Sequence, residues 1–140
     1  MTDTRTRPSR AGQLGVLLVI ALGGALGTLL RYGMSRWIHV AKDGFPWATF
    51  WTNISGAFVL GWFGAVFFQR SRARRYARPF FAIGFLGAYT TFSTMAVETV
   101  TLVKDHHALL GIAYLCISIG AGLAVAYAGI VSGRRPATRC

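Results

Sequence analysis

The chain has 140 residues, of which 54% are hydrophobic and only 14% are charged, and its net charge is +11. Soluble proteins carry charge on about 25% of their residues, so this composition indicates a single membrane domain. Long uncharged runs fill most of the chain, and the short loops and tails between them leave no room for a soluble catalytic domain.

Four runs without formal charge predict four membrane-spanning helices. The runs are 11–30, 44–69, 79–97 and 108–133. Each is close to or above the length of about 20 residues that a helix needs to cross a bilayer. We therefore expect an all-α membrane protein with a polar tail at 1–12, a transmembrane domain at 13–133 and a basic tail at 134–140. The spans themselves are expected at 14–32, 47–68, 79–103 and 108–131.

Basic residues gather in three regions that four spans would place on one side of the membrane. The N-terminal tail, the second loop and the C-terminal tail hold Arg5, Arg7, Arg10, Arg70, Arg72, Arg74, Arg75, Arg78, Arg134, Arg135 and Arg139. The other side holds Arg31, Arg36, Lys42 and Lys104. The positive-inside rule then places both termini in the cytoplasm. We attribute the basic stretches to topology and anionic lipid rather than to nucleic-acid binding.

The first two spans contain residues that a helix surrounded only by lipid would not need. Gly23 and Gly27 have the spacing that permits close approach of two helices. Arg31 ends the first span, either as an interfacial anchor or with a direct role toward an ion. In the second span, the amide of Asn53 is costly in hydrocarbon unless it is hydrogen-bonded. Asn53 therefore faces a neighbouring helix or a pore, and the sequence leaves both possibilities open.

The third span has the length of a transmembrane helix but an unusual interior. Its segment 84–95, GFLGAYTTFSTM, carries two Gly, three Thr and one Ser. Gly costs about 1 kcal/mol in a helix relative to Ala, and Ser and Thr hydroxyls compete for the backbone. We predict a break near 87–91, where freed carbonyls and half-helix ends can bind ions. The alternative is an unbroken helix whose small residues form a packing face.

Polar groups also mark the fourth span and the end of the third. Tyr114, Ser118 and Gly122 are four residues apart, so they lie on one helical face. Glu98 is the one carboxylate near a span, and its place at the span's end favours a solvated group or an ion pair over a proton relay. No triad, metal-ligand spacing or phosphate-binding loop indicates an enzyme. Because the polar groups inside the spans are mostly neutral, they favour a passive ion pathway.

The sequence resembles a known family, the Fluc fluoride channels, also called the CrcB family of bacterial fluoride exporters. The resemblance covers nearly the whole chain. It is carried by GTLLRY (27–32), FPWAT (45–49), NISG (53–56) and GAYTTFSTM (87–95), followed by Glu98. It implies a multi-pass protein of the bacterial inner (plasma) membrane. Each subunit would have four helices, the third broken at mid-membrane, and two subunits would pack antiparallel as a dual-topology dimer.

The resemblance also implies two narrow fluoride pores at the dimer interface and a structural sodium ion at its centre. Gly87 and Thr90 match the residues whose backbone carbonyls hold sodium. The residues assigned to the fluoride pore are Asn53, Thr91, Phe92, Ser93, Met95, Tyr114 and Ser118. Arg31 and Glu98 take structural or electrostatic roles.

The chemistry of these residues agrees with such a function. Fluoride holds its water tightly, so a pore must replace those hydrogen bonds with N–H donors of Asn53 and with Ser and Thr hydroxyls. A phenylalanine edge carries the positive end of the ring quadrupole and can face an anion. Sodium prefers oxygen ligands, which unwound backbone provides. A passive channel would let the membrane potential drive fluoride out and so lower its toxic level in the cytoplasm.

The chain departs from the family pattern in three respects. Met95 stands where the family has a second pore phenylalanine, and methionine has no comparable ring edge. Ala88 replaces a second Gly of the motif. The bias of basic residues toward one side disfavours insertion in both orientations. We therefore hypothesise that the chain pairs with an oppositely oriented paralogue, while an antiparallel dimer of the chain with itself stays the alternative.

Two other classes of protein compete with this interpretation. A small multidrug transporter also has four spans, but it needs a membrane carboxylate in the first span, which here has none. A non-transporting membrane subunit would fit the glycine-rich faces. It would not explain Asn53, the Thr-Thr-Phe-Ser-Thr core, or the pair Tyr114 and Ser118.

Overall fold

The computed structural model describes residues 10–39, 44–67 and 74–134, and these residues form helices with no strand among them. The elements are α1 (Arg10–Trp37), α2 (Trp47–Phe67), α3 (Arg74–Arg78), the π-helix η1 (Pro79–Phe85), α4 (Leu86–Tyr89), α5 (Phe92–Lys104) and α6 (Ala108–Gly133). The predicted all-α class is therefore confirmed for the described residues. The predictions for the tails at 1–9 and 135–140, and those for Lys42, Arg70 and Arg72, lie outside them.

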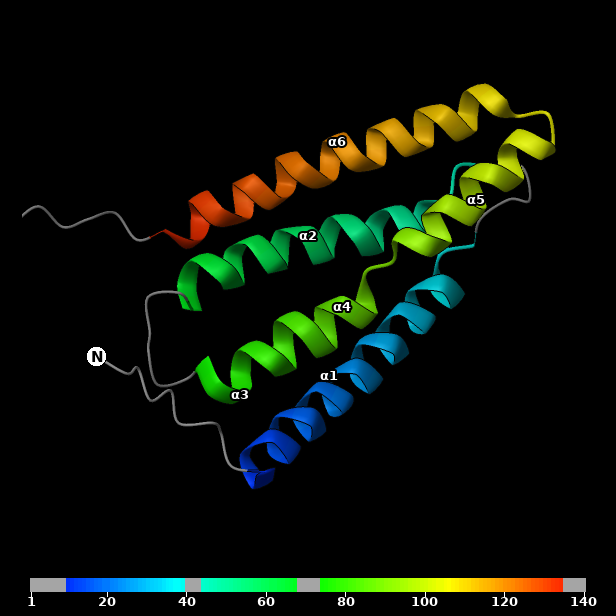
Figure 1. The fold of residues 1–140 in the computed structure, drawn as a ribbon. Coiled ribbons are helices and arrows are strands. Elements are labelled where there is room, and N and C mark those ends of the chain that lie inside the picture. The colour runs from blue at the N-terminus through cyan, green and yellow to red at the C-terminus, as the bar shows by residue number, and fades with distance from the viewer. Residues whose placement is uncertain (1–9, 40–43, 68–73, 135–140) are drawn as a thin grey trace, which may run out of the picture.

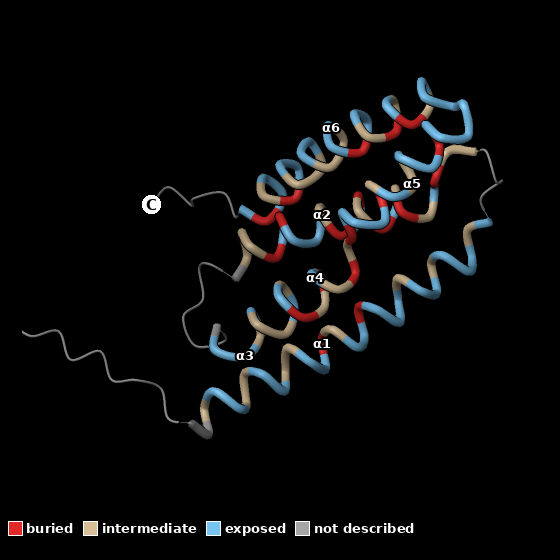
Figure 2. The backbone as a smooth tube through the Cα atoms, turned by 45° about the vertical axis from the view of Figure 1, so that its right-hand side comes forward, coloured by how far each residue is buried: buried red, intermediate tan, exposed pale blue. Residues whose placement is uncertain are grey.

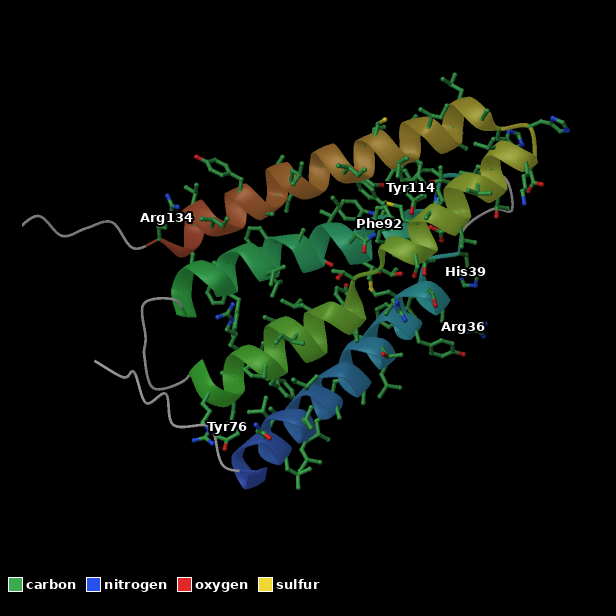
Figure 3. All side chains as sticks on the ribbon, in the orientation of Figure 1. Arg36, His39, Tyr76, Phe92, Tyr114 and Arg134 are labelled. Carbon is green, nitrogen blue, oxygen red and sulfur yellow. The ribbon has the colours of Figure 1, made fainter. Side chains whose placement is uncertain are left out.

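The long helices run back and forth along one axis (Figure 1), so that successive helices alternate in direction. The start of α1, the end of α2 and the end of α6 lie at the same end of the molecule. Arg134 and Tyr76 lie at that end and Arg36 lies at the other (Figure 3). Arg10 at the start of α1, the basic residues of α3 and Arg134 therefore share one end, as the predicted topology requires, while Arg5, Arg7, Arg70, Arg72, Arg135 and Arg139 lie outside the described residues.

Among the described residues, three helical stretches are long and apolar enough to cross a membrane: Gly12–Trp37, Arg75–Lys104 and Ala108–Gly133. The helix α2 has 21 residues but is not one of these stretches. Its first half carries Asn53 and several Thr, Ser and Trp side chains, which lower its hydropathy. The count of four spans therefore stays a prediction.

Glycines allow the helices to pack backbone against backbone in two pairs. In the pair α2 and α6, a Cβ atom on Gly61 would collide with the Ala126 carbonyl oxygen. In the pair formed by α1 with η1 and α4, a Cβ atom on Gly23 or Gly27 would collide with a backbone carbonyl of the partner segment. Backbones can approach this closely only where a side chain is missing. The close approach predicted from the spacing of Gly23 and Gly27 is confirmed.

The third long segment is interrupted at Thr90 and Thr91. Thr90 has φ −77° and ψ 153°, and Thr91 has φ −148° and ψ 118°, so both residues have extended backbone between α4 and α5. The predicted break is confirmed, and the alternative of an unbroken helix is wrong. The π-helix of η1 was not predicted, because its wider hydrogen-bonding register leaves no mark in the apolar pattern.

Buried residues concentrate where α2, α5, α6 and the break meet, whereas the outer faces of the helices are exposed (Figure 2). The buried side chains there include Thr52, Tyr89, Met95, Leu102 and Tyr114. The exposed outer faces are rich in Leu, Ile and Val, such as those on α1 and α6. Apolar outer surfaces of this extent are typical of helices that contact lipid or other helices.

Candidate functional site

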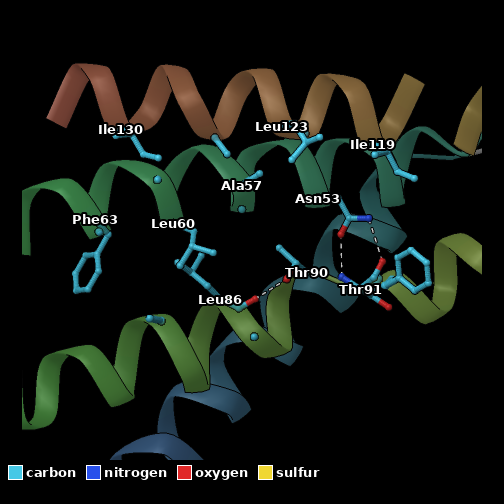
Figure 4. Close-up of a pocket in the computed structure, with 18 of the residues that line it drawn as sticks. Asn53, Ala57, Leu60, Phe63, Leu86, Thr90, Thr91, Ile119, Leu123 and Ile130 are labelled. Carbon is cyan, nitrogen blue, oxygen red and sulfur yellow. Dashed lines mark hydrogen bonds between the residues drawn. The ribbon is translucent and has the colours of Figure 1, made fainter. Parts of the chain in front are cut away.

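The side chain of Asn53 holds the extended break against α2. Asn53 Nδ2 donates a hydrogen bond to the Thr91 carbonyl at 3.0 Å, and the Thr91 N–H donates to Asn53 Oδ1 at 2.8 Å (Figure 4). The Thr91 N–H is available because the extended backbone at Thr90 and Thr91 ends the helical bonding of α4, and the Thr91 carbonyl accepts at the N-cap position of α5. The predicted role of Asn53 as an interhelical hydrogen-bonding group is thus observed. One hydrogen of the amide remains beyond the bond to Thr91, so a role toward an ion is also open.

Hydroxyl groups gather at the N-terminus of α5. Thr91 caps the helix, because its Oγ1 accepts a hydrogen bond from the Thr94 N–H at 3.2 Å. The same oxygen donates to Thr94 Oγ1 at 3.0 Å and lies 3.2 Å from Ser93 Oγ. A helix N-terminus carries partial positive charge and favours anions. Thr91 and Ser93, both assigned to the fluoride pore, are therefore adjacent groups at one helix end.

The side chains of Phe92 and Met95 differ sharply in exposure. Phe92 is 69% exposed at the start of α5, whereas Met95, one turn later, is only 4% exposed. Both residues line the groove described below. The ring of Phe92 is thus available to a second molecule or an ion. Met95 is buried within the fold of the chain itself, and its flexible thioether fills the space as methionine commonly does in cores.

The carbonyl groups at the end of α4 lose their helical partners at the break. The N–H and the Oγ1 of Thr90 both donate to the Leu86 carbonyl, at 3.0 Å and 2.8 Å. The Thr91 N–H, which would reach the Gly87 carbonyl in a continuous helix, donates to Asn53 instead. The carbonyls of Gly87 and Thr90 are therefore free of helical bonds, and they lie at the partially negative end of α4.

Glu98 is held by two hydroxyl groups. Thr49 Oγ1 donates to Glu98 Oε1 at 2.7 Å, and the Tyr114 hydroxyl donates to Oε2 at 2.8 Å. The sequence favoured a solvated end or an ion pair for this carboxylate. The structure instead gives it two neutral donors from α2 and α6, and it buries Tyr114 completely. The ring of Phe45 covers Tyr114 edge-on, with 5.1 Å between the ring centroids.

Ser118 carries an unpaired polar atom. The residue is 5% exposed, and its Oγ has no hydrogen-bond partner in the described part of the chain. Other serine hydroxyls donate to a backbone carbonyl of their own helix, as those of Ser55 and Ser132 do. Buried polar groups are rarely left without a partner. The hydroxyl of Ser118 is therefore a group that a partner from outside the subunit could satisfy.

A long groove brings most of the predicted site residues together. It has a volume of about 1040 Å³ and lies between the pair α2 and α6 on one side and α4 on the other (Figure 4). Its walls are mainly apolar. The predicted site residues that line it are Asn53, Gly87, Thr90, Thr91, Phe92, Met95 and Ser118.

Other predicted residues lie outside this groove. Arg31 lines a smaller pocket of about 290 Å³ on the other side of the break, with Thr28, Thr49 and Thr94. The remaining predicted residues, which line neither the groove nor this pocket, are Ser93, Glu98 and Tyr114. The mainly apolar groove holds the Asn53 amide and several hydroxyl groups and also includes Arg78 and Arg134 in its lining, whereas the smaller pocket holds Arg31.

Sequence reasoning missed two members of this site. Thr49 was not assigned to it, although its hydroxyl donates to Glu98. Ser55 was not assigned either, and its Oγ lies 2.9 Å from the Tyr89 hydroxyl at the end of α4. Both residues fall within the motifs FPWAT and NISG that carried the family resemblance. That position was the available signal, but neither residue type is unusual enough to stand out alone.

Comparison with known proteins identifies the relatives of this chain. Residues 18–130 match the family model described as CrcB-like protein, Camphor Resistance (CrcB). The chain is 41% identical to the fluoride-specific ion channel FluC 1 of Streptomyces coelicolor over 91% of this chain and 85% of that protein. It is similar to two proteins of Streptomyces avermitilis. FluC 2 is 42% identical over 82% of this chain and 73% of its own length. FluC 3 is 39% identical over 89% of this chain and 61% of its own length.

Proposed function

Because the chain belongs to the CrcB family, we propose that it is a fluoride-selective channel that passively exports fluoride from the cytoplasm. The chain is not an enzyme, since its relatives are named as ion channels. The proposed location is the bacterial plasma membrane. Four spans, including α2 as the second, are part of this proposal.

The observation that carries the proposal is the position of the break beside the groove. The Asn53 amide, the capping hydroxyl of Thr91 and the exposed ring of Phe92 lie together where the break borders an apolar groove. These are neutral N–H, O–H and C–H donors. They suit a small, strongly hydrated anion, which must exchange water for protein hydrogen bonds. Ser118, which lines the same groove, adds a buried hydroxyl without a partner among the described residues.

The test is fluoride efflux from liposomes that contain the purified chain, with chloride efflux measured in parallel. We expect fluoride to leave rapidly and chloride to stay. Equal efflux of both anions would contradict selectivity. Absence of efflux from the lone chain and also from the chain mixed with an oppositely oriented paralogue would contradict the channel.

A structural sodium ion is compatible with the residues at the break. A hard cation prefers oxygen ligands, and the carbonyls of Gly87 and Thr90 are released by the extended backbone at Thr90 and Thr91. When bound, the ion would supply fixed positive charge near the anion pathway. One subunit offers only part of a sodium coordination shell, so the proposal needs matching carbonyls from a second subunit.

We also propose that the groove is covered by a second subunit of the same fold packed antiparallel. The groove is long, apolar and open on the surface of a single subunit, and it contains site residues along its length. Covering it would bury apolar surface and complete the surroundings of Ser118 and Phe92. The bias of basic residues favours an oppositely oriented paralogue as the partner, although a second copy of the chain is the simpler alternative. The two relatives from Streptomyces avermitilis are a case of one organism with more than one such protein.

Two glycines on α6 test this interface. A Cβ atom on Gly122, which lines the groove, or on Gly120, which does not, would meet nothing within 4 Å. Gly122→Trp should therefore leave the subunit folded but abolish the proposed dimer with the paralogue or with a second copy, as measured by size-exclusion chromatography with light scattering. Gly120→Trp serves as the matched control and should remain dimeric. A dimer of unchanged stability in Gly122→Trp would contradict the proposed interface.

A further inference from the structure

The helix α2 meets the break through a glycine and a methyl group. Gly56 is buried on α2, one turn after Asn53, and both Gly56 and Thr90 line the groove. A Cβ atom on Gly56 would collide with Thr90 Cγ2 and would lie 3.3 Å from Cδ1 of the Tyr89 ring. The methyl group of Thr90 therefore fills the space that any larger residue at position 56 would need.

Hydrogen bonds fix the two side chains that face Gly56. The Oγ1 of Thr90 donates to the Leu86 carbonyl at 2.8 Å, which holds the side chain in the orientation that directs Cγ2 toward α2. The hydroxyl of Tyr89 is paired with Ser55 Oγ at 2.9 Å, and its ring is 7% exposed. Neither side chain can turn away from Gly56 without losing a hydrogen bond.

The same short stretch of α2 makes the hydrogen bonds that hold the break. Asn53 lies three residues before Gly56, so the two residues share one face of the helix. Thr91, which Asn53 binds at 2.8 Å and 3.0 Å, directly follows Thr90. The contact between Gly56 and Thr90 thus lies directly beside the pair of hydrogen bonds between Asn53 and Thr91.

We infer that Gly56 is a positioning residue of the fluoride pathway, with the methyl group of Thr90 as its counterpart. The absence of a side chain at position 56 sets the distance between α2 and the break. That distance determines whether the Asn53 amide, the α5 cap and the carbonyl of Thr90 keep their relative positions. The inference rests on the proposed channel function for its effect on flux, while the contact itself is independent of that function.

A pair of substitutions can add and remove the same methyl group. Gly56→Ala adds a methyl group at the contact, and Thr90→Ser removes Cγ2 while it retains the hydroxyl that donates to Leu86. Gly56→Ala should lower fluoride efflux at least about tenfold, because small displacements of binding groups have large effects on rate. The double variant should return to within about threefold of the unsubstituted chain, since volume-conserving changes are tolerated. Thr90→Ser alone, which leaves the space of one methyl group empty, is the reference against which the rescue is measured.

Two controls separate this contact from general effects of the substitutions. Gly33 lies exposed on α1 with nothing within 4 Å of a Cβ atom, so Gly33→Ala should leave efflux and melting temperature unchanged or slightly higher. In the double variant Gly56→Ala with Thr90→Val, a methyl group remains at the Cγ2 position. That variant should stay as impaired as Gly56→Ala, because the clash with the added methyl group remains. If it were rescued as well, the rescue would come from weakened contacts at position 90 rather than from removal of the clash.

The cycle of single and double variants is measured twice, as fluoride efflux from liposomes and as the melting temperature of the purified protein by tryptophan fluorescence. Rescue of both quantities by Thr90→Ser supports the inference. Failure of Thr90→Ser to rescue either quantity overturns it, as does normal efflux from Gly56→Ala with a lowered melting temperature. The unsubstituted chain could also give no efflux while the melting temperatures show rescue. That result would confirm the steric contact between Gly56 and Thr90, but it would contradict the proposed channel function and, with it, the role of Gly56 in positioning the fluoride pathway.

Discussion

The two helix pairs that glycines hold in close contact differ from the groove between them in how tightly the backbone packs. Within each pair, backbones touch backbones, and the glycines leave no room for anything else. Between the pairs, the groove stays open, with extended backbone at Thr90 and Thr91 and, among the described residues, a buried hydroxyl without a partner at Ser118. The comparison teaches that the closed pairs leave no space for a ligand, whereas the polar groups without helical partners lie where the pairs separate. Substitutions in the two regions should therefore affect different quantities.

The largest effect is expected for Gly27→Ala, which tests the closed pairs. A Cβ atom on Gly27 would collide with the Phe85 carbonyl oxygen, so the helices must move apart. We expect a loss of about 3 kcal/mol in the free energy of unfolding, measured by denaturation in mixed detergent micelles. Gly33→Ala on the same helix is the matched control. Equal effects of the two substitutions would contradict the special role of the closed pairs.

A smaller effect is expected for Asn53→Ala at the border between the two regions. The variant loses both hydrogen bonds to Thr91, each of which contributes about 1 kcal/mol. We expect the free energy of unfolding to fall by about 2 kcal/mol and fluoride efflux to fall with it. Ser35→Ala, which removes an exposed hydroxyl bonded to its own helix, should change neither quantity. An unchanged free energy of unfolding in Asn53→Ala would show that other contacts hold the break against α2.

The hydroxyl of Tyr114 should contribute less than the Asn53 amide. Tyr114→Phe keeps the buried ring but removes one of the two hydroxyl donors to Glu98 and leaves that of Thr49. We expect a loss of about 1.5 kcal/mol, the lower range for a hydrogen bond to a charged group, in the same unfolding measurement. Tyr127 lies exposed on the same helix, and Tyr127→Phe is the matched control. If both variants unfold alike, the bond to Glu98 adds nothing to stability.

The smallest effect on stability is expected for Ser118→Ala. Because the Ser118 hydroxyl has no partner within the described residues, its removal should change the free energy of unfolding by less than about 0.5 kcal/mol. Fluoride efflux should nevertheless slow, because the groove loses a donor. A clear loss of stability would reveal a partner inside the subunit, and unchanged efflux would remove Ser118 from the pathway.

The sequence was most informative about single helices. Uncharged runs located the helical segments, and glycine spacing at Gly23 and Gly27 indicated a close contact. Two glycines and several hydroxyl residues marked the break within a few positions of Thr90 and Thr91. Each of these features depends on neighbouring residues along the chain, through length, local propensity and helical periodicity. For that reason the order of the amino acids alone determines them.

The tertiary structure decided which groups meet. The sequence left Asn53 between two roles and favoured solvent or a cation for Glu98, whereas packing gave Asn53 the Thr91 backbone and gave Glu98 two hydroxyls. Helical periodicity states which residues share a face, but it does not state which helix that face contacts. The contact of Gly56 with Thr90 likewise places α2 against the break. That contact joins residues far apart in the sequence, so only the folded chain determines it.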